Sequence, residues 1–243
     1  MSLRVALMRP IEDARRSAEV LRACGFEPIF APVMALRATG AQPPDESFDA
    51  ILATSANAFA CLSAQARAGL AGLTLYVAGE RTAAAASAAG FGEADEIAPD
   101  AVALAASIVA RLPRASRLLY LAARDRKGDL EAALAAAGHR VVATEVYVAE
   151  ARPAWGAAEA IAFSTCGAAL HYSRRSAELA GILAERARLS AHLRALLHAC
   201  LSQDAAEPLR AFGATRIVVA SGARESLLID ALSAAARIAN SGP

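Results

Sequence analysis

The sequence contains no run of uncharged apolar residues long enough to span a bilayer. Its first ten residues also lack the apolar segment and the small-residue cleavage pattern of a signal peptide. The four cysteines, Cys24, Cys61, Cys166 and Cys200, show no CxxC spacing, which argues against a disulfide or zinc framework and for reduced thiols. We therefore expect a cytoplasmic protein with no membrane partner.

The sequence also lacks strong net charge and the common cofactor motifs. The formal net charge is +1, so bulk charge gives no support to nucleic-acid binding. No GxGxxG motif follows the first predicted strand, where the residues MRPIED stand instead. The chain has no P-loop and no GxSxG nucleophile motif. We expect no nucleotide or dinucleotide cofactor.

The histidines show no spacing typical of a metal site, and no HExxH motif is present. We place His192 and His198 in or near a helical stretch, in structural or solvent-facing roles. His171 follows a serine loop, where an exposed helix position is favoured over an approach to a ligand. The sequence therefore predicts no metal centre.

Hydrophobic residues make up 56% of the chain, and much of this content is alanine, which favours closely packed helices. Residues 4–33 and 117–147 share a pattern of strand, arginine-bearing loop, amphipathic helix, closing glycine and second strand. Two further pairs follow the strand, loop and helix order: 48–62 with 158–172, and, more weakly, 75–91 with 198–214. This repetition predicts an α/β fold with parallel sheets and helices on both faces. Prolines and composition mark 32–42 and 146–155 as candidate linkers.

Polar residues follow the predicted strands, at the edge where such sheets bind ligands. Hydroxyls and free backbone N–H groups at helix N-termini bind anions, and arginines add charge-assisted hydrogen bonds. Taken singly, each serine or threonine is an ordinary helix cap and each arginine a solvated surface residue. Together they predict a site for a ligand that carries several carboxylates. The candidate contacts are Arg9, Thr54, Ser55, Arg81, Thr82, Arg124, Ser164 and Thr165, and Arg126 is a further arginine in the same loop as Arg124.

Tyr147 lies in the segment EVYVAEARP, at the edge of a candidate linker. One interpretation is a packed aromatic residue of a strand. The other is a hydroxyl that overlooks an interdomain cleft and donates a proton, since a phenol with a pKa of about 10 is neutral at pH 7.

The ordered set of motifs resembles the uroporphyrinogen-III synthase family. The resemblance rests on Arg9-Pro10, ATSANAF, YVAGERTA, LAARDRKGDLEAAL, VYVAEAR and FSTCGAAL, which span nearly the whole chain. It implies two similar α/β domains, each a parallel sheet flanked by helices, joined by a two-stranded linker. The first would comprise residues 1–35 plus 150–243, and the second residues 36–149.

The resemblance also implies the activity. The family cyclises linear hydroxymethylbilane to uroporphyrinogen III, inverts the last pyrrole ring, and uses no metal or organic cofactor. The resemblance implies a small-molecule substrate and leaves open a transient contact with the preceding pathway enzyme. Nothing in the sequence demands more than a monomer, and we expect one. Tyr147 matches the family's candidate proton donor, Thr82 its Gly-x-x-Thr-Ala loop, and Ser55 and Ser164 its serine loops.

One loop departs from the family pattern. The segment CLSQDAA places Gln203 and Asp204 where many members have glycine and hydroxyl residues, and an acidic side chain disfavours a carboxylate there. This departure supports an alternative, a non-catalytic two-domain ligand-binding or regulatory relative. A periplasmic-type solute receptor is a second alternative, against which the missing signal peptide counts.

Overall fold

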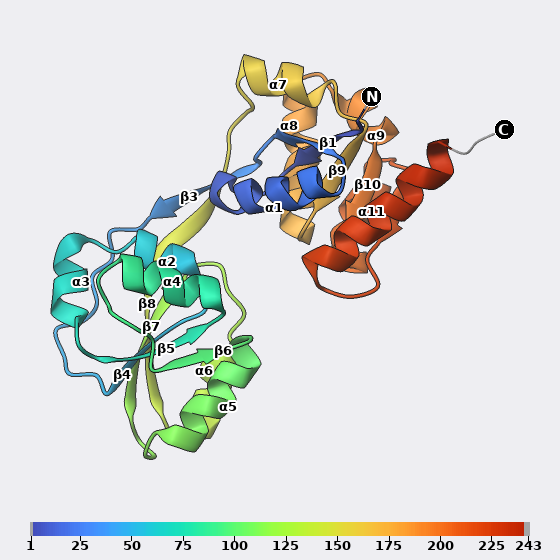
Figure 1. The fold of residues 1–243 in the computed structure, drawn as a ribbon. Helices are drawn as coiled ribbons and strands as arrows, with labels where there is room; N and C mark the ends of the chain where they lie inside the picture. Colours follow the sequence, from blue (N-terminus) through green and yellow to red (C-terminus); the bar gives the residue numbers. More distant parts are fainter. Residues whose placement is uncertain (1, 241–243) are drawn as a thin grey trace. The chain divides into compact units, whose positions relative to one another are not determined.

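The computed structural model describes residues 2–240 and confirms the predicted α/β fold class, with parallel sheets flanked by helices (Figure 1). The chain divides into two compact units by its internal contacts. Unit 1 combines the residues up to Ala35 with those from Glu150 onward, and unit 2 is Leu36–Ala149. The chain passes from one unit to the other within two strands, β3 (Met34–Ala38) and β8 (Arg140–Ala151).

The described part of unit 1 holds a five-stranded sheet in the order β11-β10-β9-β1-β2. Its paired strands run parallel, with Val5 opposite Ala168 and Ala6 opposite Ile29. The strands are β1 (Arg4–Leu7), β2 (Glu27–Phe30), β9 (Ala168–His171), β10 (Leu197–Cys200) and β11 (Ile217–Val219). The helices are α1 (Ile11–Ala23), α7 (Ala157–Phe163), α8 (Arg174–Arg186), α9 (Ser190–Ala195), α10 (Gln203–Ala211) and α11 (Glu225–Asn240).

Helices α1 and α11 share one face of this sheet. Ala14, Ala18 and Leu21 of α1 recur at helical spacing and are fully buried. They join Leu228 and Leu232 of α11 in one core with the strand residues beneath them. Helix α1 lies against β1 and β2, and α11 lies against β10 and β11 (Figure 1). The first and last helices of the chain therefore share one core, although they are about 200 residues apart in sequence.

Unit 2 holds a sheet in the order β3-β8-β7-β4-β5-β6. Its remaining strands are β4 (Ala50–Ala53), β5 (Thr74–Ala78), β6 (Glu96–Ala98) and β7 (Arg117–Ala123). One face is covered by α2 (Ala56–Ala60), α3 (Ala64–Leu70) and α4 (Glu80–Ala88). The other face is covered by α5 (Ala101–Arg111) and α6 (Asp129–Ala136).

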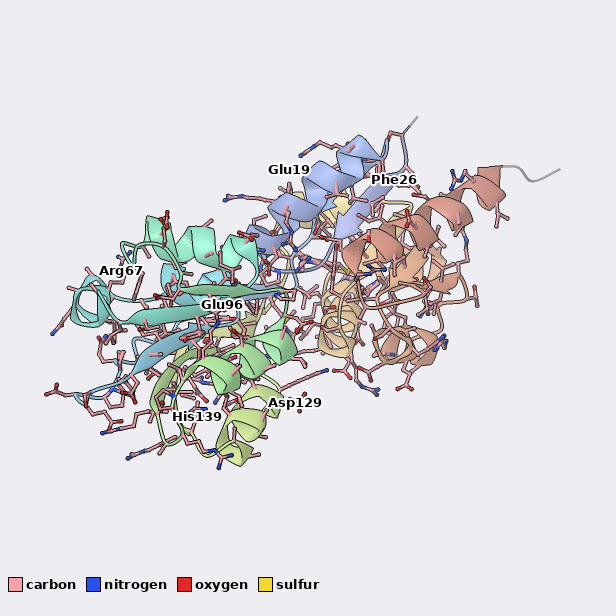
Figure 2. All side chains as sticks on the ribbon, turned by 60° about the horizontal axis from the view of Figure 1, so that its bottom comes forward. Glu19, Phe26, Arg67, Glu96, Asp129 and His139 are labelled. Carbon is pink, nitrogen blue, oxygen red and sulfur yellow. The ribbon has the colours of Figure 1, made fainter. Side chains whose placement is uncertain are left out.

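Successive strand residues of unit 2 point to opposite faces. Ile51 and Leu119 pack towards α2 and α4, whereas Leu52 and Tyr120 pack towards α5 and α6. Because both faces are buried, the strands are continuous apolar runs rather than alternating ones. Charged side chains such as Glu19 and Asp129 are exposed on the helices (Figure 2).

Two of the three predicted repeat pairs are confirmed. The units β1-α1-β2 and β7-α6-β8 match, and each helix is followed by a glycine with positive φ, Gly25 at 83° and Gly138 at 92°. The pair β5-α4 and β10-α10 matches as well.

The pairing of 48–62 with 158–172 is wrong in its second half. Residues Ala157–Phe163 form helix α7 instead of a strand, and the side chain of Glu159 caps its start by accepting from the Gly156 N–H at 2.8 Å. The strand comes afterwards, as β9. The segment that corresponds to β4-α2 is therefore β9-α8, about eight residues further on.

The predicted exposed helix position of His171 is also wrong, because His171 lies in β9 and is fully buried. His198 lies in β10, shortly after helix α9, and it is also fully buried, in agreement with a structural role. His192 does lie in a helix, α9, where its Nε2 is 3.0 Å from the Phe163 carbonyl. Within residues 2–240, no three histidine, cysteine or acidic side chains group as metal ligands, and no helix has the length and apolarity to cross a membrane.

Candidate functional site

Three neighbouring strands of unit 2, β7, β4 and β5, end at one edge of the sheet, and most of the predicted contacts lie there. Thr54 and Ser55 follow β4, and Arg124 follows β7. Gly79 starts α4 directly after β5 with φ 83°, so Arg81 and Thr82 lie in the first turn of that helix. N–H groups at the start of a helix that find no acceptor within it favour anions. Ser55 accepts from the Asn57 N–H at 3.3 Å, which confirms its role as a cap.

Thr54 and Tyr120 form a hydroxyl pair at this edge, with 2.8 Å between their oxygens. Both lie on the sheet face covered by α5 and α6, and Tyr120 is only 4% exposed. Burial raises the pKa of the Tyr120 phenol, while the hydrogen bond with Thr54 opposes the shift. The phenol is therefore a neutral donor or acceptor at physiological pH.

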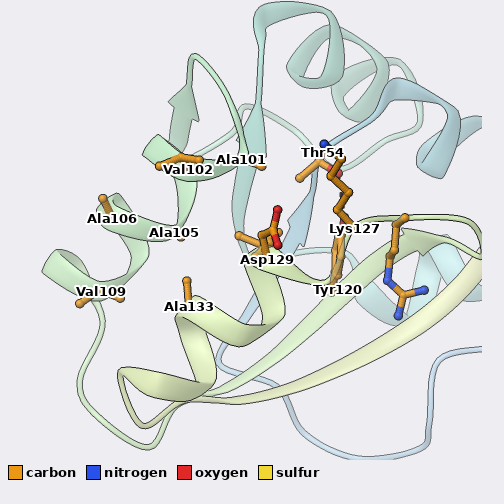
Figure 3. Close-up of a pocket in the computed structure, with 12 residues that line it drawn as sticks. Thr54, Ala101, Val102, Ala105, Ala106, Val109, Tyr120, Lys127, Asp129 and Ala133 are labelled. Carbon is orange, nitrogen blue, oxygen red and sulfur yellow. Dashed lines mark hydrogen bonds between the residues drawn. The ribbon is translucent and has the colours of Figure 1, made fainter. Parts of the chain in front are cut away.

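A pocket of about 530 Å³ opens beside this pair, between α5 and α6 (Figure 3). Its wall is apolar and includes Val102 and Val109 of α5 and Ala133 of α6. Its polar end holds the hydroxyl pair with Arg126, Lys127 and Asp129. Such a combination suits a flat apolar group that carries a polar arm.

The two cations of the pocket differ in how they are held. Arg126 donates to Glu131 at 2.8 Å and to Glu145 at 3.2 Å, and it lies 5.9 Å from the centre of the Tyr120 ring. Lys127 is the only lysine in the sequence, and within residues 2–240 it makes no ion pair. The ammonium of Lys127 is thus available to an anionic ligand.

Unit 1 has a second polar cluster at the carboxyl ends of β1 and β9. Arg9 follows β1 and Tyr172 follows β9, and the guanidinium lies 4.0 Å from the centre of the tyrosine ring. The Tyr172 hydroxyl donates to Glu225 at 2.6 Å, and the Ser17 hydroxyl donates to the same carboxylate. Burial, followed by the bond to Glu225, raises the pKa of Tyr172.

The family model described as uroporphyrinogen-III synthase HemD matches residues 15–230. The chain belongs to the uroporphyrinogen-III synthase family. Members of this family are enzymes of tetrapyrrole synthesis. Comparison with curated proteins finds no match.

Solved structures of uroporphyrinogen III synthases share the fold. The enzyme from Helicobacter pylori is 16% identical, with 96% of this chain and 100% of that chain covered and a TM-score of 0.59. A mutant enzyme from Thermus thermophilus is 18% identical, with 98% and 100% covered and a TM-score of 0.51. At these identities the likeness establishes the fold and no residue roles.

Tyr147, the predicted proton donor, lies on the face of unit 2 opposite the Thr54–Tyr120 pair. A β-bulge sets its direction, because Ala122 pairs with Glu145 whereas Ala123 pairs with Tyr147. Val146 and Tyr147 consequently both pack against the core beneath α2 and α4. Tyr147 remains half-buried, and its carbonyl accepts from the Arg124 N–H at 2.9 Å.

The other contacts predicted for unit 2 differ in exposure. Thr82 is 4% exposed, and its N–H donates to the Gly79 carbonyl at 2.9 Å, so most of this residue belongs to the core. Arg81 is half-buried. The Arg124 side chain is 55% exposed and pairs with Glu145 at 3.3 Å.

The predicted position of Ser164 and Thr165 after a strand is wrong. Both residues end helix α7, where Ser164 donates to the Ile161 carbonyl at 2.8 Å and Thr165 to the Ala162 carbonyl at 2.6 Å. They precede β9 and so lie at the amino end of the sheet, away from its ligand-binding edge. In the sequence, an apolar stretch is interrupted by these small polar residues. This pattern does not indicate whether the strand comes before or after them.

Two serines of unit 1 follow strands at the carboxyl edge of the sheet, Ser173 after β9 and Ser202 after β10. Ser173 caps α8 by accepting from the Ser176 N–H, and Ser202 caps α10 by accepting from the Ala205 N–H, each at 3.2 Å. Asp204, in the divergent loop, pairs with Arg174 at 3.1 Å. Its charge is therefore partly offset.

Sequence reasoning missed Ser17, Tyr172 and Glu225 as members of the unit 1 cluster. The correct alignment of β9-α8 with β4-α2 would have placed Tyr172 after a strand, in the position of Thr54. No local signal marks Ser17 or Glu225, because their contact depends on α1 and α11 packing side by side.

Proposed function

We propose that the chain is a uroporphyrinogen-III synthase that closes linear hydroxymethylbilane to uroporphyrinogen III and inverts the terminal pyrrole ring. The observation that carries this proposal is the family match over residues 15–230. As part of the same proposal, the chain acts as a cytoplasmic monomer on a small-molecule substrate, and a transient contact with the preceding enzyme remains compatible with it.

The reaction begins with loss of the substrate's hydroxymethyl oxygen. The electron-rich pyrrole expels the hydroxyl group, which takes up a proton and leaves as water, and the ring becomes an azafulvene. The terminal pyrrole then attacks this electrophile through its already substituted carbon and forms a spiro intermediate. The carbon–carbon bond that joined the terminal ring to its neighbour in the linear chain then breaks, and the neighbour becomes an azafulvene in turn. The terminal ring attacks this azafulvene through its other, unsubstituted carbon, and that carbon loses its proton. The reaction class is that of a cyclising hydro-lyase without a cofactor.

The protein's task in this scheme is chiefly orientation. Without it, the open chain closes through the unsubstituted carbon and gives the type I isomer. Holding reacting atoms in a productive geometry accounts for several orders of magnitude in rate. Proton donation to the departing hydroxyl adds a smaller factor, because the pyrrole itself drives ionisation. Tyr147 is the proposed donor, since it is half-buried beside the carboxyl end of β7 and matches the family motif.

The substrate's acetate and propionate arms need cations, hydroxyls and amides. The carboxyl edge of unit 2 supplies them through the proposed contacts Thr54, Ser55, Arg81, Thr82 and Arg124, and that of unit 1 through Arg9. We add the α5–α6 pocket as a seat for one carboxylated pyrrole ring, because it joins an apolar wall to the free ammonium of Lys127 (Figure 3). Ser164 and Thr165 are not part of this set.

Isomer analysis tests the proposal. The protein is incubated with freshly generated hydroxymethylbilane, and the products are oxidised and separated into type I and type III porphyrins. The expected result is predominantly type III, formed faster than spontaneous closure in a heat-denatured control. Type I alone, at the spontaneous rate, would refute the proposal and favour the non-catalytic relative, which would then bind a tetrapyrrole without turnover.

A further inference from the structure

Glu225, the first residue of α11, inserts its carboxylate into a set of donors at the carboxyl ends of β1 and β9. Its Oε1 accepts from the Tyr172 hydroxyl at 2.6 Å and from the Ser17 hydroxyl, and lies 3.3 Å from Nη1 of Arg9. Arg16 approaches the other oxygen at 3.6 Å. Two neutral hydroxyls and two guanidinium groups thus converge on one carboxylate.

Three of these donors, Arg9, Ser17 and Tyr172, are held in place by the surrounding structure. Ser17 is fully buried in α1, and the Arg9 guanidinium stacks on the Tyr172 ring at 4.0 Å. The Arg9 and Glu225 side chains are 17% and 20% exposed, so the set is sheltered but open to solvent on one side. Rigid donors at the edge where parallel sheets bind ligands form a ready-made anion site.

Glu225 does not satisfy all of these hydrogen-bond donors. Its distance to Arg9 exceeds the 2.7–2.9 Å that is typical of a charge-assisted bond. Nε of Arg9 is buried and finds no acceptor within residues 2–240. A buried donor without a partner is costly, and an arginine favours two-pronged contact with a carboxylate. A carboxylate that is not tethered to α11 can approach Arg9 more closely than Glu225 does.

Glu225 is also placed where it can leave. It begins α11 directly after the loop 220–224, and no strand carries it. If the Glu225 side chain turns to a rotamer that points into solvent, its carboxylate leaves the donors. The buried contacts of Leu228 and Leu232 on the same helix are not disturbed by this change.

We propose that Arg9, Ser17 and Tyr172 form a binding site for a carboxylate arm of the substrate, and that Glu225 occupies this carboxylate site until the substrate displaces it. The inference rests on the proposed function for the identity of the ligand, a pyrrole bearing acetate or propionate arms. Glu225 then acts as an internal competitor, because substrate binds tightly only to molecules whose site is vacant. If Glu225 occupies the site in about nine molecules out of ten, the apparent affinity is lowered about tenfold.

The first experiment does not depend on turnover. Glu225→Ala empties the carboxylate site, and sodium propionate at millimolar concentration is expected to raise the melting temperature of this variant above that in equal sodium chloride. Wild type should show no such rise, because the tethered carboxylate already fills the site. The double variant Glu225→Ala with Arg9→Ala should lose the response. A propionate response that is equal in all three proteins overturns the inference.

The second experiment measures competition. Glu225→Gln keeps the size of the side chain and removes its charge, so the KM for hydroxymethylbilane and the Kd for uroporphyrin I should fall by up to about tenfold. The matched control is Glu159→Gln, because Glu159 also pairs with an arginine of unit 1, Arg152, at 2.6 Å, but at the start of α7. That control should leave KM and Kd unchanged. A purely structural Glu225 would lower the melting temperature in Glu225→Gln and leave both constants unchanged or raised.

The two proposals fail separately. If wild type forms only the type I isomer but Glu225→Gln binds uroporphyrin I more tightly than wild type, the proposed function is wrong and the carboxylate site stands. If wild type forms type III but neither the KM nor the Kd falls in Glu225→Gln, the synthase stands and Glu225 is a structural residue.

Discussion

His171 and His198 contact each other across the neighbouring strands β9 and β10, with 3.0 Å between Nε2 of His171 and Nδ1 of His198. Nε2 of His198 lies 2.8 Å from the Leu193 carbonyl, so it must carry the proton. Nδ1 of the neutral His198 is then the acceptor for the Nε2–H of His171. Nδ1 of His171 is left as a buried bare nitrogen without a partner in the described chain. The contacts thus fix both tautomers of a neutral pair.

The first prediction concerns acid stability. Burial lowers the pKa of His198 to about 4, and burial together with the nearby His198 lowers the pKa of His171 well below 6.5. The unfolded chain therefore binds more protons than the folded chain below pH 6.5, and the folded state loses stability as the pH falls. Each histidine costs about 1.4 kcal/mol per pH unit within its window, which for His198 extends from about 6.5 to about 4.

Urea unfolding at pH 7.5, 6.0 and 5.0 measures this loss. The variant His171→Leu removes one titrating group and leaves the Nδ1 atom of His198 without a donor. We expect it to cost about 1–3 kcal/mol at pH 7.5 and to show a shallower loss between pH 6 and 5. If the free energy of unfolding of His171→Leu falls between pH 6 and 5 as steeply as that of wild type, groups other than this histidine pair cause the acid sensitivity.

The second prediction compares Arg126 with Arg124, which both pair with Glu145. The Arg126 side chain is 21% exposed and also binds Glu131, whereas Arg124 is 55% exposed. Arg126→Met leaves Glu131 without its arginine and Glu145 with Arg124 alone, and it should cost about 1–3 kcal/mol of stability, while Arg124→Met should cost less than about 0.5 kcal/mol. Thermal melts and urea titrations measure both values.

Ligand binding should follow the opposite order. Arg124 is the better placed for a substrate carboxylate, since its single exposed ion pair is weak and easily exchanged. The Kd for uroporphyrin I should therefore rise more in Arg124→Met than in Arg126→Met. If the two variants lose equal stability and equal affinity, the difference in exposure between Arg124 and Arg126 does not separate a ligand-binding role from a structural one.

Local patterns predicted much of the fold because each strand–loop–helix unit has its own signals. Gly25 and Gly138 marked two helix ends, and buried strands stood out as apolar runs. The same signals failed at 157–163, where a short run rich in alanine suits a helix as well as a strand. The cluster around Glu225 was beyond local prediction, because Arg9 and Glu225 are 216 positions apart and meet only through helix packing.

The third prediction concerns the proposed proton donor. Tyr147→Phe should keep the fold, because the ring still packs beneath α2 and α4. Its kcat should fall by roughly tenfold. This loss is at or below the lower end of the rate factors that general acid catalysis usually contributes, because the pyrrole itself assists the departure of water. Tyr76→Phe is the matched control, a tyrosine of β5 in the core on the other face, and it should keep the wild-type kcat. Unchanged kinetics in Tyr147→Phe would exclude this residue from the mechanism.

The last prediction tests the α5–α6 pocket with two adjacent alanines of one helix. Ala133 lines the pocket and Ala132 does not, although both are exposed on α6. Leucine is a good helix former, so neither Ala133→Leu nor Ala132→Leu should change the free energy of unfolding by more than about 0.5 kcal/mol. The added side chain of Ala133→Leu occupies space that a pyrrole ring would need, and the Kd for uroporphyrin I, measured by fluorescence quenching, should rise at least several-fold. Ala132→Leu should bind as wild type does. If the two variants bind equally well, the pocket takes no part in ligand binding, and the arms of the substrate are held by the strand ends alone.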